Sequence, residues 1–129
     1  MRGPGRPGLL LVEDDPLLLV AMAELFNEQG YAVSQVDSLK TALELVEFKD
    51  FDVIVADWKM HDGNAGSLYK WILKNKPHLA ARVVFLSEAD QDDSGPVAPG
   101  RPMFRKGMDS QALIEVLKDI VSAVRGGGS

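Results

Sequence analysis

The chain alternates short apolar segments with longer segments in which apolar residues recur every three or four positions. The short segments are rich in valine, leucine and isoleucine, which is typical of buried β-strands, and they span residues 9–12, 32–36, 51–56, 83–86 and 103–105. Four longer segments have helical spacing, with apolar positions such as Leu18, Met22, Leu39, Val46, Leu68, Ile72, Leu113 and Leu117. This alternation predicts an α/β fold, in which a five-stranded parallel sheet is covered by helices.

The length of 129 residues is enough for one compact domain. Both ends are rich in glycine, proline or serine, so we expect residues 1–8 and 126–129 to be flexible tails. The folded domain is therefore expected to span residues 9–125.

Composition excludes several classes of protein. The longest apolar run, residues 17–23, is far shorter than the roughly 18–20 residues that cross a bilayer, and the first residues lack the apolar core of a secretory signal. We therefore expect a cytoplasmic protein without a membrane span. The absence of cysteine excludes disulfides and thiolate zinc sites. A net charge of −5 argues against direct nucleic-acid binding and favours proteins or cations as partners.

Polar residues follow the ends of the predicted strands. Glu13 and Asp14 follow the first strand, Asp57 the third, Ser87 the fourth and Lys106 the fifth. The carboxyl ends of parallel strands meet at one edge of a sheet, so these side chains are expected to lie together. Carboxylates at one edge repel each other unless a cation neutralises them, and a few carboxylates completed by water suit Mg²⁺.

Each of these residues has an ordinary structural explanation when it is taken alone. A single aspartate at a strand end is usually a helix cap or a solvated turn, and a single lysine is usually a surface residue. Accidental caps would not need to gather at the ends of different strands on one edge of a sheet. The combination therefore favours a functional site.

Four segments of the chain resemble the receiver domain of two-component response regulators and hybrid histidine kinases. They are the acidic turn in LLLVEDDP at 9–16, VIVADWKM at 53–60, VVFLS at 83–87 and RPMFRK at 101–106. The resemblance extends over residues 9–125 and implies the flavodoxin-like (βα)5 three-layer sandwich. The segment at 66–86 is more similar to receivers of hybrid histidine kinases than to those of DNA-binding regulators.

The resemblance implies that the domain is a phosphorylated signalling domain of a phosphorelay rather than an enzyme. Asp57 would take a phosphoryl group from phosphohistidine on a histidine kinase or a histidine phosphotransfer protein. Lys106 and Ser87 would contact the phosphoryl oxygens and so switch the conformation. The output partner is not specified by the sequence.

The resemblance also implies a magnesium site. Asp14, Asp57 and the backbone carbonyl of Lys59 would hold Mg²⁺ directly, and Glu13 would act mainly through water.

Four residues depart from the family pattern. Gly107 stands where the family usually has a proline with a cis peptide bond, and Met103 where it has a switch aromatic residue. Glu88 occupies a position where the family normally has a small residue, and its charge is expected to repel a phosphodonor. His61 replaces a common proline, a change expected to alter loop stiffness more than chemistry.

The segment at 88–101 has no apolar helical face, although the family has its fourth helix there. We expect this helix to be shortened or disordered. Together with the four departures, this segment supports an alternative function, a pseudo-receiver that docks a protein partner without phosphorylation. The two functions differ in whether replacing Asp57 with asparagine affects signalling.

Overall fold

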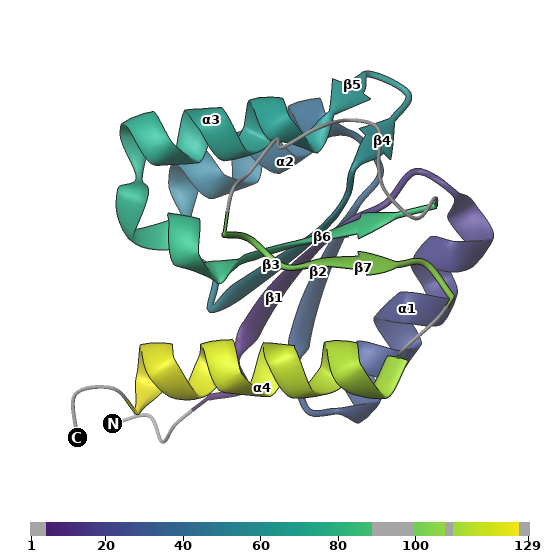
Figure 1. The fold of residues 1–129 in the computed structure, drawn as a ribbon, viewed down its shortest axis with the longest axis vertical. Coiled ribbons are helices and arrows are strands. Elements are labelled where there is room, and N and C mark those ends of the chain that lie inside the picture. Colours follow the sequence, from purple (N-terminus) through teal and green to yellow (C-terminus); the bar gives the residue numbers. More distant parts are fainter. Residues whose placement is uncertain (1–4, 89–99, 108–109, 127–129) are drawn as a thin grey trace.

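In the computed structural model, residues 5–88, 100–107 and 110–126 are described. Five parallel strands form one sheet in the order β2-β1-β3-β6-β7 (Figure 1). The strands are β1 (Gly8–Val12), β2 (Ala32–Val36), β3 (Val53–Asp57), β6 (Val83–Ser87) and β7 (Met103–Arg105). The expected α/β fold with a five-stranded parallel sheet is confirmed.

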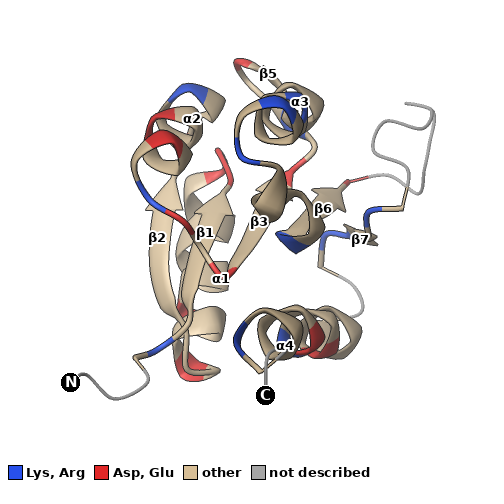
Figure 2. Ribbon diagram, turned by 90° about the vertical axis from the view of Figure 1, so that its left-hand side faces the viewer, with Lys and Arg blue, Asp and Glu red and all other residues tan. Residues whose placement is uncertain are grey.

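Helices cover both faces of the sheet, which gives three layers. Figures 1 and 2 show α2 and α3 on one face and α1 and α4 on the other. The helices of the described residues are α1 (Pro16–Glu28), α2 (Leu39–Phe48), α3 (Ala65–Asn75), α4 (Ser110–Arg125) and the 3₁₀ helix η1 (Pro77–Arg82). The strands are mostly tan in Figure 2, whereas red and blue segments lie mainly on helices and loops.

Each face of the sheet has its own apolar core. Leu10, Ile54 and Phe85 are buried beneath α2 and α3, whereas Leu11 and Val55 are buried beneath α1 and α4. Neighbouring strand residues point to opposite faces, so central strands buried on both sides must be apolar throughout. This requirement explains the continuous apolar runs of the sequence.

Local capping places α1 directly after the first strand. The Asp15 carboxylate accepts hydrogen bonds from the amides of Leu17 and Leu18. Pro16 lacks a backbone N–H, but it lies in the first turn of the helix, where an N–H would have no acceptor within the helix. The helix ends before Gly30, whose φ of +100° reverses the chain. Local residues thus determine both ends of α1.

Two small elements were not expected from the sequence. A short hairpin of β4 (Lys59–Met60) and β5 (Gly63–Asn64) lies between β3 and α3, and η1 follows α3. The Asp62 carboxylate accepts hydrogen bonds from the first two amides of α2, so the hairpin is joined to that helix.

The first described residues pack against the domain. Gly8 begins β1, one residue earlier than expected, and the guanidinium of Arg6 donates hydrogen bonds to the carbonyls of Asn27 and Gly30. Arg125 at the end of α4 donates to the Asp52 carboxylate. Residues 1–4 and 127–129 of the expected tails lie outside the described residues.

The fourth family helix was expected to be shortened or disordered in the segment at 88–101, of which residues 89–99 lie outside the described residues. Within the described part of the chain, no helix is long and apolar enough to span a membrane.

Candidate functional site

The carboxyl edge of the sheet gathers the residues that the sequence singled out. Glu13 and Asp14 follow β1, Asp57 ends β3, Ser87 ends β6, and Lys106 follows β7. One carboxylate oxygen from each of the three acidic residues lies within 4.8 Å of the others. Parallel strand order and register therefore bring together residues that lie up to 93 positions apart in the chain.

Lys106 is the cation of this site. Its Nζ atom donates a hydrogen bond to Asp57 Oδ2 at 2.9 Å and lies 3.2 Å from Glu13 Oε1. The Lys106 side chain is 10% exposed, and the two carboxylates are almost fully buried. A buried ammonium between two buried carboxylates leaves a net negative charge in a region of low dielectric.

This environment changes the acidity of both partners. Burial, helped by the charges of Glu13 and Asp14, raises the pKa of Asp57 to about 6, although the hydrogen bond from Lys106 opposes the rise. Burial alone would lower the pKa of Lys106, but its hydrogen bond and attraction to Asp57 raise the pKa above the ordinary 10.5. At neutral pH, Lys106 is charged and Asp57 is an ionised carboxylate that the metal-free site destabilises.

We expect the stability of the metal-free protein to depend on Asp57 ionisation. Its pKa is 3.8 in the unfolded chain and about 6 in the folded one, so folding favours the protonated form and stability falls as pH rises through this interval. The free energy of unfolding of the Asp57→Asn variant, relative to that of wild type, should therefore rise by about 2 kcal/mol as the pH is raised from about 4 to about 7. Urea unfolding at both pH values measures this gain, and parallel pH profiles would contradict it.

Asp14 is oriented by the loop that contains His61. Its Oδ2 atom accepts a hydrogen bond from the backbone amide of His61 at 2.7 Å and lies 3.3 Å from the ring Nδ1. His61 was expected to alter mainly the stiffness of the loop, and its contact with Asp14 was not expected from the sequence. No local pattern could have revealed it, because the two residues are 47 positions apart.

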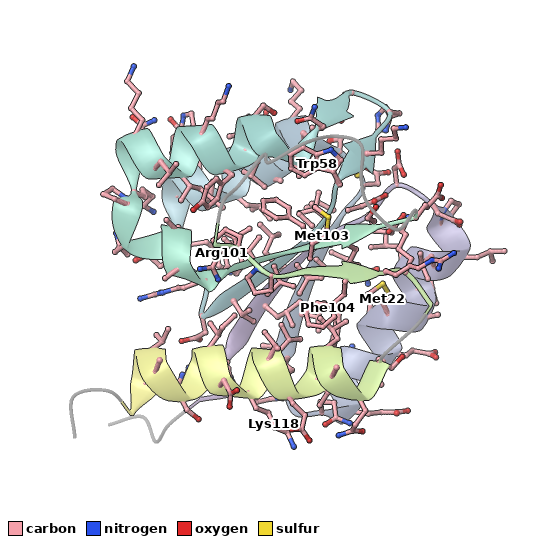
Figure 3. The ribbon with its side chains drawn as sticks, in the orientation of Figure 1. Met22, Trp58, Arg101, Met103, Phe104 and Lys118 are labelled. Carbon is pink, nitrogen blue, oxygen red and sulfur yellow. The ribbon has the colours of Figure 1, made fainter. Side chains whose placement is uncertain are left out.

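Backbone contacts hold the segment that follows Asp57. The amide of Trp58 donates to the carbonyl of Leu86, and the amide of Ala65 donates to the carbonyl of Trp58. The Trp58 ring packs so closely on α3 that a Cβ atom added to Gly66 would lie 2.8 Å from it. A larger residue at position 66 would therefore displace the Trp58 ring, which lies against α3 in Figure 3.

Ser87 and Lys59 lie beside the acidic cluster. The carbonyl of Ser87 accepts a hydrogen bond from the amide of Lys106 at 2.8 Å, which joins the end of β6 to the lysine. Lys59 belongs to β4, two residues after Asp57, and it is exposed. The structure thus places both residues next to the site without assigning them a role.

Three of the four residues that depart from the family pattern lie near Lys106, either in space or within three positions of it in the chain. Glu88 Oε2 is 3.9 Å from Lys106 Nζ, and the Glu88 side chain is 80% exposed. Gly107 has a φ of +77°, which favours glycine, and no peptide bond of the described residues is cis. Met103 is 44% exposed on the face of β7 towards α3, whereas Phe104 packs on the α4 side (Figure 3).

The donor set fits a hard divalent cation. Three carboxylates converge, and buried Glu13 Oε1 makes no hydrogen bond, although the Lys106 ammonium lies 3.2 Å from it. A bound cation or cation-bound water would add to the neutralisation that this single ammonium provides. Oxygen ligands of this number suit Mg²⁺ better than a fully protein-made Ca²⁺ cage.

The model of the response regulator receiver domain matches residues 9–100 of the chain. The chain belongs to this family. The matched residues include Glu13, Asp14, Asp57 and Ser87, and they end before Lys106. Receiver domains are signalling domains of two-component systems, as the resemblance implied.

Two curated relatives have similar sequences. The transcriptional regulatory proteins GlrR of Escherichia coli K12 and QseF of Escherichia coli O157:H7 are each 26% identical to this receiver over 112 residues. The match covers 86% of this chain but only 25% of each relative. The chain therefore spans about a quarter of the length of these regulators.

Solved receiver structures share the fold. The receiver of the Francisella response regulator 1452 is 24% identical with a TM-score of 0.78, and covers 92% of this chain and 98% of its own. The receiver of a Syntrophus aciditrophicus histidine kinase is 25% identical with a TM-score of 0.77, covering 92% of both chains. Thermotoga maritima TrrA, solved with Mg²⁺-BeF, is 20% identical with a TM-score of 0.79, covering 88% and 98%.

Proposed function

We propose that this receiver accepts a phosphoryl group on Asp57 from phosphohistidine of a histidine kinase or histidine phosphotransfer protein. The observation that carries the proposal is the buried Asp57 carboxylate, bound to Lys106 at 2.9 Å and grouped with two more carboxylates. The domain, residues 9–125, would act in the cytoplasm as a signalling domain rather than as an enzyme. Its output partner follows from neither the site nor the fold.

The three carboxylates are the proposed ligands of Mg²⁺. Asp14 and Asp57 would bind the ion directly, Glu13 would bind through water, and the carbonyl of Lys59 would complete the protein ligands. The Oε1 atom of Glu13 supports this assignment, since it makes no hydrogen bond and has the Lys106 ammonium at 3.2 Å. The bound ion would neutralise part of the negative charge of the carboxylates and of an incoming phosphoryl group.

Asp57 is the proposed nucleophile. One of its carboxylate oxygens would form a bond to phosphorus while the bond from phosphorus to the imidazole nitrogen of the donor breaks. The electron pair of the broken bond stays on that nitrogen, and the donor leaves as histidine. Asp57 then carries an acyl phosphate, whose phosphoryl oxygens need positive charge on several sides.

Lys106 and Ser87 would supply contacts that exist only after phosphorylation. The Lys106 ammonium already binds Asp57, so it needs only a small displacement to reach a phosphoryl oxygen. The Ser87 hydroxyl would donate a hydrogen bond to another one. Contacts that differ between the two states shift the population between two conformations.

Incubation with acetyl phosphate and Mg²⁺ tests this function. We expect intact-mass spectrometry to show one added phosphoryl group, and excess chelator to prevent the addition because the site needs its cation. Ca²⁺ at the same concentration is the control for ionic strength. A protein that stays unmodified with Mg²⁺ would contradict the proposal.

A second candidate function is phosphorylation-independent docking of a protein. It is favoured by the exposed Met103, which has no aromatic ring to couple to Ser87, and by Gly107, which leaves the lysine segment less restrained. Loss of partner binding in the Asp57→Asn variant would exclude this alternative.

A further inference from the structure

Glu88 stands at the solvent side of the site. It directly follows Ser87, its side chain is 80% exposed, and its Oε2 atom lies 3.9 Å from Lys106 Nζ. The two other carboxylates near this ammonium, from Glu13 and Asp57, are 0% and 3% exposed. Lys106 therefore has two buried carboxylates on its inner side and one exposed carboxylate on its outer side.

The charge balance around Lys106 is negative before any phosphodonor arrives. One ammonium faces three carboxylates within 4.0 Å, and Asp14 adds a fourth acidic group to the same edge. Mg²⁺ held by Glu13, Asp14 and Asp57 would offset these carboxylates, and Glu88 is not a member of that cluster. An approaching anion meets the Glu88 charge within the screening length of about 8 Å.

We propose that Glu88 sets the donor specificity of this receiver. It disfavours small, highly anionic phosphodonors and favours a protein donor that places a lysine or arginine beside its phosphohistidine. The inference rests on the proposed phosphorylation of Asp57 and names the class of donor. A basic side chain next to the phosphohistidine would pair with Glu88 while the phosphoryl group reaches Asp57 and Lys106.

The effect of Glu88 is electrostatic, because its exposed side chain is free to move away from a donor. Replacing it with glutamine keeps the size and removes the charge. We expect the Glu88→Gln variant to be phosphorylated about fivefold faster by acetyl phosphate at low salt, and this gain to shrink as salt is raised. Phosphoramidate carries less negative charge than acetyl phosphate. With this donor, the rate of phosphorylation of Glu88→Gln should therefore exceed that of wild type by a smaller factor.

Glu47→Gln is the matched control. Glu47 is an exposed glutamate near the end of α2, which lies towards the opposite edge of the sheet, and its replacement changes the net charge by the same amount. Its rates should equal those of wild type. Glu88→Ala separates charge from size, since it should match Glu88→Gln if only the charge matters.

Two histidine peptides test the favoured donor. Both are phosphorylated on histidine with phosphoramidate, one has lysine beside the histidine and the other has glutamate. Wild type should take the phosphoryl group about fivefold faster from the lysine peptide, Glu88→Gln should reduce this preference, and Glu88→Lys should reverse it. Intact-mass spectrometry over time gives all rates.

Three results would overturn the inference. The first is that Glu88→Gln is phosphorylated at the same rates as wild type. The second is that Glu47→Gln is accelerated as much as Glu88→Gln. The third is that only Glu88→Ala is accelerated, which would show a steric effect. Failure of the proposed function looks different, because wild type and every variant would then stay unmodified with all donors. That result would remove both proposals together.

Discussion

The Asp57→Asn variant should not take up a phosphoryl group from acetyl phosphate in the presence of Mg²⁺. An amide is a poor nucleophile and cannot form the acyl phosphate, so intact-mass spectrometry should show only the unmodified mass. The fold should persist, because asparagine matches the shape of aspartate and Lys106 keeps Glu13 at 3.2 Å. The loss is expected to be complete, since no other carboxylate of the cluster ends β3.

Asp119→Asn is the control for this experiment. Asp119 is exposed on α4, so the variant has the same change of charge outside the site. It should be modified like wild type. Phosphoryl uptake that survives in Asp57→Asn would show that another residue is the acceptor.

Replacing Lys106 with methionine should destabilise the metal-free protein by about 3 kcal/mol at about pH 8. The variant removes the ammonium and leaves the buried carboxylates of Glu13 and Asp57 without a cation. At about pH 5 the loss should be smaller, because Asp57 without Lys106 has a still higher pKa and takes a proton. Urea unfolding at both pH values measures the difference.

Lys40→Met shows what an exposed ion pair contributes. Lys40 is 80% exposed and pairs with Glu44 on the same helix, so its replacement should change stability by less than about 0.5 kcal/mol. An equal loss in both lysine variants would contradict the buried site. Mg²⁺ should restore part of the stability of Lys106→Met, since the proposed ion neutralises the same carboxylates.

The elements with strong periodicity could be predicted from the sequence. The strand at residues 32–36 has the expected bounds, because the valine-rich segment that predicts it is a local property of the sequence. The first helix begins at Pro16 because the adjacent Asp15 caps it, which is also a local property. The hairpin at Lys59–Asn64 was missed because each strand has only two residues, too few for a periodic pattern. The missed η1 has the same cause, since a 3₁₀ turn after Pro77 has no apolar repeat.

The candidate site was only partly predictable. Asp57, Lys106 and the other acidic residues could be predicted to form the site, because they follow parallel strands that end at a common edge of the sheet. The complete burial of Glu13, in contrast to the partly exposed Asp14 beside it, could not be predicted. Neighbouring residues after a strand point in different directions, and only the packed layers decide which one is enclosed.

The sequence by itself determined the alternation of strands and helices, the helix caps and the kinds of chemical groups available at the strand ends. Only the tertiary structure decided that Lys106 lies between buried and exposed carboxylates, and that His61 contacts Asp14. The physical reason is the separation along the chain of the residues that interact. Periodicity and capping act over a few residues, whereas these contacts depend on strand order and register between segments that are distant in the chain.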